Sequence, residues 1–244
     1  MNKLIRSICF SLIIGLLVSY SNCWAAEKNS NYAESSYCEE DSFLDSAIEK
    51  FNEMTIDELN DYIDSKSNDS ANISLMSDDQ GDAEAGTESI NNNAKLAWLA
   101  FASIARKKGY PCSATLIECS VKNRNYSEGI NGSFGKKIKN TAPHKNALKK
   151  AKKSKKKKYS SSTAFEKKDS KDLYYSLHNV NYSFLKIKTG NLPATYTVTY
   201  SDTYDFAYKG QYKDMLTTLA NNAGWLSQHM GVLHPIKVKI TFPC

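Results

Sequence analysis

Apolar positions recur at helical spacing in the first part of the chain. Residues 42–54 carry apolar side chains three and four positions apart, at Phe43, Leu44, Ala47, Ile48 and Phe51. Residues 55–63 begin with Thr55 and Glu58, which have the spacing of a capping box, and continue with an apolar stripe. The two patterns predict a helical hairpin within residues 27–64.

Two more helical segments follow a polar gap. Residues 65–92 are rich in Ser, Asn, Asp and Gly and poor in apolar residues, so they cannot recover their ordering entropy by burial. We predict that they form a flexible linker. The next segment has a helical apolar stripe that stops at Gly109, and a second helix is predicted at 111–122 with Pro111 in its first turn.

Alternation of apolar and polar residues replaces the helical period from residue 178 onward. Residues 178–188 and 194–208 both alternate, and the Gly- and Pro-containing segment between them predicts an antiparallel hairpin. A helical stripe that ends at Gly231 and a last alternating strand at 236–242 follow. The chain from 93 to 244 is thus predicted to be α+β, with a small antiparallel β-sheet packed against helices.

Residues 1–26 have the order of a secretory signal peptide. Lys3 and Arg6 precede an apolar stretch that is too short to span a bilayer, and Ala25 and Ala26 follow it. We therefore expect cleavage near Ala26 and secretion of the mature chain, either released or retained at the cell surface. A lipid anchor at Cys23 is a weaker alternative, because the residues before this cysteine lack the usual Leu.

Charge divides the remaining chain into two opposite parts. Residues 27–92 contain eighteen Asp and Glu against three Lys, a net charge of −15, whereas residues 93–244 contain twenty-seven Lys and Arg against eight acids, a net charge of +19. One hypothesis is that the acidic part lies over a cationic surface, as a propeptide would. It would then weaken binding at that surface until the chain is cleaved in the linker.

Lysines are concentrated in residues 136–158, and no acid occurs between Glu128 and Glu166. This segment has almost no apolar face, so we predict a solvated, partly helical protrusion. Each lysine near an anionic surface contributes roughly 1 kcal/mol, within a Debye length of about 8 Å. We predict that polyanions bind to Lys136, Lys137, Lys139, Lys145, Lys149, Lys150, Lys152, Lys153, Lys155, Lys156, Lys157 and Lys158.

Several partners have this anionic chemistry. The predicted ligands are anionic polymers of the cell envelope and membranes with anionic lipids, and free nucleic acid is an alternative. A simpler interpretation is that the lysines keep the protein soluble and bind nothing. A third hypothesis is an interaction with a cognate partner or an immunity protein encoded beside it.

Four cysteines remain after the predicted leader, at Cys38, Cys112, Cys119 and Cys244. In an exported protein they allow two disulfides in three connectivities. Cys112 and Cys119 are about 10 Å apart along a single helix and so cannot be bonded to each other. The alternative is that both are small buried apolar side chains on one helical face.

No recognised catalytic motif occurs in the sequence. There is no Gly-x-Ser-x-Gly segment, no P-loop and no helical His-x-x-x-His pair, so no metal or other cofactor is indicated and the protein need not be an enzyme. If the protein is an enzyme, the candidates for catalysis are Asp202, Asp205 and His178. In a strand, Asp202 and Asp205 point to opposite faces, which favours a structural role at a strand end over an acid–base pair.

Three segments together carry a resemblance to a known family. DLYYSLHNVNYSF, SDTYDFAY and NNAGWLSQHMGVLHPIKVKITF resemble an uncharacterised family of proteins secreted by low-GC Gram-positive bacteria, over about residues 40–244. This resemblance implies a bacterial exported protein and implies no activity.

The SDTYDF segment alone is also similar to bacteriocins of the colicin M type, which cleave the lipid-linked peptidoglycan precursor. Asp202, Tyr204 and Asp205 match that motif, but the His-Arg pair that follows in those bacteriocins is missing here. The alternative function that this likeness implies is an envelope-directed enzyme or toxin.

Overall fold

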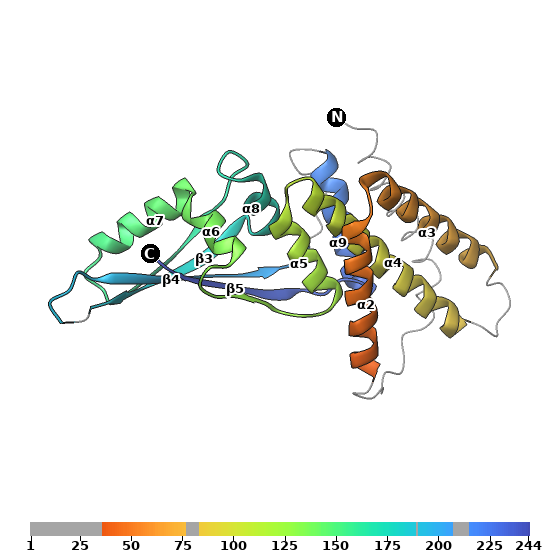
Figure 1. The fold of residues 1–244 in the computed structure, drawn as a ribbon, viewed down its shortest axis with the longest axis horizontal. Helices are drawn as coiled ribbons and strands as arrows, with labels where there is room; N and C mark the ends of the chain where they lie inside the picture. Colours follow the sequence, from red (N-terminus) through yellow and green to blue (C-terminus); the bar gives the residue numbers. More distant parts are fainter. Residues whose placement is uncertain (1–35, 77–82, 189, 207–214) are drawn as a thin grey trace.

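The computed structural model describes residues 36–76, 83–188, 190–206 and 215–244. Within these residues the protein is α+β: a five-stranded sheet carries helices on one face, and a second group of helices lies at one end of the sheet (Figure 1). This confirms the fold class predicted from the alternation of apolar residues. The predicted leader at residues 1–26 lies outside the described residues.

The strands are β1 (Tyr126–Glu128), β2 (Lys158–Ala164), β3 (Asn179–Ile187), β4 (Thr195–Tyr204) and β5 (Ile236–Pro243). Their order in the sheet is β1-β5-β4-β3-β2, and all neighbours are antiparallel except β1 and β5. The predicted hairpin is therefore confirmed as β3 and β4, and the predicted last strand as β5. The expectation of a purely antiparallel sheet is corrected, because β1 pairs with β5 in parallel.

Alternate residues of the three central strands form the core beneath the helices. In register across β3, β4 and β5, the side chains of Tyr182, Tyr200 and Ile240 lie side by side, and all three are buried. The intervening residues, such as Lys237 and Lys239, are exposed on the opposite face. One face of the sheet is thus apolar and covered, which is the usual reason for a strict two-residue period.

Helices α2 (Ser36–Glu53) and α3 (Ile56–Met76) form the predicted acidic hairpin, and both pack against α4 (Ala83–Lys107). The capping box is confirmed: the Thr55 amide donates to Glu58 at 2.7 Å, and the Glu58 amide donates to Thr55 Oγ1 at 3.3 Å. Helix α3 ends at Met76 and helix α4 begins at Ala83. Helix therefore occupies much of the segment 65–92 that was predicted to be a flexible linker.

The lysine-rich segment is not a protrusion. It forms α6 (Ser133–Lys139) and α7 (Ala142–Lys153), which contact β5 and β2 respectively. Gly135 lets α6 approach the sheet closely, since a Cβ atom there would lie 2.9 Å from the Phe242 ring. On α6 the large side chains Phe134 and Ile138 are buried, whereas the buried side chains of α7 are His144 and two alanines, which add little to an apolar pattern.

The remaining helices are α5 (Pro111–Val121), α8 (Lys171–Ser176) and α9 (Met215–His229). Pro111 occupies the first turn of α5, as predicted. Cys112, Cys119 and Cys244 are free thiols, so these three cysteines form none of the disulfides that the sequence allows. Cys112 is buried and Cys119 half-buried on α5, as in the alternative of two apolar side chains on one helical face. The side chain of Cys38 lies outside the described residues.

Candidate functional site

Helix α7 has one face on the sheet and one face of lysines. The hydroxyl of Thr141 caps its first turn by accepting from the amide of His144 at 3.3 Å. His144, Ala147 and Ala151 are buried toward the sheet. The spacing of three and four residues leaves Lys145, Lys149, Lys150, Lys152 and Lys153 exposed on the other side. The buried face therefore fixes the direction in which the lysines point.

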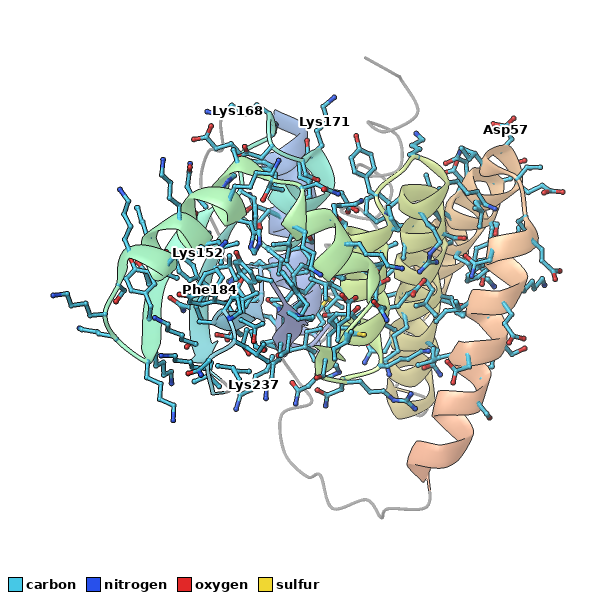
Figure 2. The ribbon with its side chains drawn as sticks, turned by 60° about the vertical axis from the view of Figure 1, so that its left-hand side comes forward. Asp57, Lys152, Lys168, Lys171, Phe184 and Lys237 are labelled. Carbon is cyan, nitrogen blue, oxygen red and sulfur yellow. The ribbon has the colours of Figure 1, made fainter. Side chains whose placement is uncertain are left out.

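Eleven of the twelve lysines predicted to bind polyanions are exposed. They form what we call the lysine surface, made of exposed positions on α6, on α7 and in the turn that leads into β2: Lys136, Lys139, Lys145, Lys149, Lys150, Lys152, Lys153, Lys155, Lys156, Lys157 and Lys158. Figure 2 shows Lys152 on the opposite side of the molecule from Asp57, which lies on the acidic helix α3. The two kinds of charge are separated in space as well as in sequence.

Lys137 has a different role from its neighbours. It is half-buried, and its Nζ lies 2.5 Å from Oδ2 of Asp172 on α8. The Asp172 carboxylate also accepts from the amides of Cys112 and Ser113, at 3.0 and 2.9 Å, and so caps α5. Burial alone would raise the pKa of Asp172, but Lys137 and these amide donors outweigh it and lower the pKa. Lys137 is therefore a structural cation.

A hollow of about 330 Å³ lies beside the lysine surface, between α7, β2 and the loop before α8. Two lysines, Lys150 and Lys168, and two carboxylates, Glu166 and Asp169, line it, and Lys168 forms an ion pair with Glu166 at 2.6 Å. Its walls contain the hydroxyls of Ser162 and Thr163, so the hollow is polar. It is large enough for a phosphate or carboxylate group of a longer anionic ligand.

The three candidates for catalysis lie at one end of the sheet, but they do not form one centre. Asp202 is half-buried on β4, and its pKa is raised to about 6, mainly by burial and also by the charge of Asp205. Asp205 is exposed just beyond the end of β4. The ring of His178 contacts Tyr174 and lies 3.3 Å from the carbonyl of Phe165. Among the described residues, no hydrogen bond joins His178 to either aspartate.

Another pair of chemically active groups was not found from the sequence. Cys244 Sγ lies 3.9 Å from Nε2 of His144, and Nδ1 of the same ring lies 3.0 Å from the hydroxyl of Tyr200. The backbone amide of Cys244 donates to the carbonyl of Tyr196 at 2.7 Å, which fixes the chain beneath α7 (Figure 1). No spacing rule could predict this pair, because one hundred positions separate Cys244 from His144.

Other kinds of site find no support in the described part of the chain. There, no group of three His, Cys, Asp or Glu side chains is arranged to hold a metal ion. None of the described helices combines the length and the apolar character needed to cross a bilayer. Comparisons with protein-family models, with curated proteins and with solved structures give no match to this chain. The resemblance to secreted proteins of Gram-positive bacteria stays a prediction.

Proposed function

We propose that the lysine surface binds anionic polymers or membranes of the cell envelope, reversibly and without a covalent anchor. The observation that supports this proposal is the fixed orientation of α7: its buried Ala147 and Ala151 hold the lysines of the other face toward solvent. Eleven exposed cations then lie within twenty-three consecutive residues that contain no acid. A partner with phosphate or carboxylate groups complements such a surface.

The strength of this interaction follows from simple electrostatics. A lysine near an anionic membrane surface contributes roughly 1 kcal/mol. Engaging four or five of the eleven lysines would therefore give about 4–5 kcal/mol, enough for retention at a surface and little enough for release. Because the charges are exposed, salt screens them within a Debye length, which shrinks to about 3 Å at 1 M ionic strength. Binding must then weaken strongly with salt.

Exposed apolar side chains at the end of the sheet beside these lysines favour a membrane over a soluble polymer. Leu185 and Ile187 on β3 are 42% and 43% exposed, and Leu192 in the turn that follows is 65% exposed. Leu185 is paired in register with Lys158, so an apolar and a cationic side chain lie next to each other on the same face of the sheet. Such a combination suits the boundary between lipid headgroups and acyl chains. Attraction of the lysines to the headgroups would bring these apolar side chains to the bilayer.

The test is sedimentation of the protein with phosphatidylglycerol vesicles and, separately, with purified teichoic acid. Replacing Lys149, Lys150, Lys152 and Lys153 with Gln should lower the affinity at 0.1 M salt by at least tenfold, since about 4 kcal/mol of attraction is lost. The matched control has the same change in net charge on exposed positions elsewhere, namely Lys50, Lys171, Lys237 and Lys239 to Gln. It should bind almost as the native protein does.

Two outcomes would contradict the proposal. Binding that is equal in dilute buffer and in 1 M sodium chloride would show that the attraction is not electrostatic. Equal losses in the two lysine variants would show that net charge matters and the lysine surface does not. A Leu192→Ser variant distinguishes the ligands, because it should weaken binding to vesicles and leave binding to teichoic acid unchanged.

A second candidate function is the envelope-directed enzyme or toxin. The observation in its favour is the half-buried Asp202, whose pKa of about 6 lies in the range of a general acid or base. Asp202→Asn should then abolish hydrolysis of a lipid-linked peptidoglycan precursor, and Asp205→Asn, which removes a charge that raises this pKa, should also impair it; both should leave vesicle binding intact. Absence of hydrolysis by the native protein would remove this candidate.

A further inference from the structure

Three rigid elements bring a thiol, an imidazole and a phenol together at the end of the sheet. Cys244 extends β5, His144 lies on α7 and Tyr200 lies on β4. The distances are 3.9 Å from Cys244 Sγ to His144 Nε2 and 3.0 Å from His144 Nδ1 to the Tyr200 hydroxyl. A nucleophile, a base within reach of it and a third group that orients the base form the usual arrangement of an activated nucleophile.

The three side chains differ in their exposure to solvent, and this difference determines what each can do. Cys244 is exposed, whereas His144 is only 4% exposed and Tyr200 is 0% exposed. The imidazole ring lies between the rings of Phe184 and Phe242, with centroids 6.0 and 5.5 Å away, so its orientation is fixed by packing. A ligand from solvent can therefore reach the sulfur atom while His144 and Tyr200 stay inside the protein.

We propose that Cys244 is a nucleophilic thiol that reacts with anionic disulfides, with His144 as its base and Tyr200 as a positioning residue. The tautomer required has its proton on Nδ1, which donates to the Tyr200 hydroxyl and leaves the lone pair of Nε2 directed at the thiol. This reactivity does not require the binding of polyanions proposed above, although Lys139, Lys145 and Lys152 belong to the lysine surface.

The chemical step is thiol–disulfide exchange. As the sulfur of Cys244 attacks one sulfur of the disulfide, its proton passes to Nε2 of His144. A new sulfur–sulfur bond forms to Cys244, the original disulfide bond breaks, and the leaving thiolate takes the proton from His144. One disulfide is consumed and one mixed disulfide is formed, so no further oxidant is needed.

The charges around the pair favour an anionic partner. The titratable groups that face it are Lys139 of α6, Lys145 and Lys152 of α7, Tyr182 of β3 and Tyr200 of β4. Burial raises the pKa of the Cys244 thiol, and Lys139 and Lys152 partly oppose this effect. The same lysines attract carboxylate groups on an approaching disulfide and stabilise negative charge on the attacking and leaving sulfurs.

His144 is neutral at physiological pH, as a base must be. Burial, with the charges of Lys139 and Lys145, lowers its pKa to about 4. The resting state is therefore a neutral thiol beside a neutral imidazole, and the proton moves only during attack. Among the described residues, Cys112, Cys119 and Cys244 are all free thiols.

The experiment measures the rate at which each cysteine of the full chain reacts with 5,5′-dithiobis(2-nitrobenzoate), an anionic disulfide, at pH 7, with peptide mass spectrometry to assign the adducts. Cys244 should react at least tenfold faster than the same residue in a peptide of residues 236–244. In His144→Gln this rate should fall about tenfold or more, while the rate at Cys119 stays unchanged. Lys152→Gln should slow the anionic reagent more than the neutral reagent 2,2′-dithiodipyridine.

A Tyr200→Phe variant keeps the proposal testable if His144→Gln does not fold, which would be visible as rapid reaction at the buried Cys112. It keeps the ring in the core and removes only the hydroxyl, and it should lower the rate of reaction at Cys244 several-fold.

The pH dependence provides a second readout: below the thiol pKa, the native rate at Cys244 should rise less steeply with pH than the rate at Cys119. Reaction of Cys244 at the rate of the free peptide, or unchanged rates in both variants, would overturn the proposal.

Discussion

Asp172 shows how one buried carboxylate can join three helices. It belongs to α8, caps the first turn of α5 through the amides of Cys112 and Ser113, and forms an ion pair with Lys137 of α6. Its side chain is only 3% exposed. A charge this deeply buried must be paired, because an uncompensated buried charge costs several kcal/mol.

Asp172→Asn should therefore destabilise the protein, by about 3 kcal/mol, as measured by urea unfolding at pH 7. Since the pKa of Asp172 is lowered by folding, its contribution is present above the unfolded value near 4 and is lost as pH falls below it. The difference between native protein and variant should shrink below pH 4.

Lys137→Met should lower the free energy of unfolding by a similar amount, while Lys136→Met, at an exposed position one residue away, should change it by less than about 0.5 kcal/mol. Equal effects of the two lysine substitutions would contradict the role given to Lys137.

Local signals in the sequence predicted some residues correctly and could not predict others. The capping box of Thr55 and Glu58 and the first-turn Pro111 depend on neighbours within four residues, so they are visible in the sequence. The contacts of Asp172 and Cys244 join positions 35 to 100 residues apart, and only the fold brings these together. Lys137 looks identical to Lys136 until burial distinguishes them.

At the scale of elements, α7 depends on the small size of its buried side chains. Ala147 and Ala151 are 3% and 2% exposed, and α7 contacts β2. Alanine lets the helix backbone approach the sheet, and larger side chains would overpack this contact.

Ala151→Leu should lower the free energy of unfolding by about 1–3 kcal/mol, because Ala151 is buried toward the sheet, away from the hollow, and added methyl groups would overpack this contact. The control is Lys153→Leu, on the exposed face of the same helix, which should change stability by less than about 0.5 kcal/mol. Chemical unfolding of both variants measures the difference. If Ala151→Leu were as stable as the control, α7 would not be packed on the sheet as described.

The strands of the sheet show why the predicted fold was incomplete. Strands β3, β4 and β5 have strong alternation and were predicted, whereas β1 has only three residues and β2 consists largely of serine. A serine-rich edge strand gives no apolar period, because neither of its faces is fully buried. The parallel pairing of β1 with β5 is a long-range property that no local pattern encodes.

At the scale of the whole molecule, the acidic and basic parts lie at opposite ends. Helices α2 and α3 pack on α4, whereas the lysine surface lies over the far end of the sheet (Figures 1 and 2). The described residues of the acidic part therefore do not cover the lysine surface. This arrangement argues against the hypothesis that the acidic part shields that surface as a propeptide would. An ion pair between Asp45 and Lys122 instead links the acidic helix α2 to the end of α5.

The acidic helices also contribute to the hydrophobic core. Leu44, Phe51, Leu59 and Ile63 are at most 2% exposed, and burying each such side chain contributes about 1.5–3 kcal/mol. Polar contacts add to this packing: the hydroxyl of Ser103 on α4 donates to the carbonyl of Phe51 at 2.9 Å. Helices α2 and α3 therefore behave as a structural part of the domain.

This packing predicts the result of cutting the chain between the acidic and basic parts. In a full-length protein with a protease site inserted between Met76 and Ala83, cleavage should leave both fragments associated, so that they elute together in size-exclusion chromatography. Phe51→Ala, which removes about 3–5 kcal/mol of packing, should allow them to separate after cleavage, whereas Phe43→Ala, at a 51% exposed position, should not. Vesicle binding should be the same before and after cleavage, because the acidic helices lie away from the lysine surface. Fragments that separate in native buffer, with a gain in vesicle binding, would restore the propeptide hypothesis.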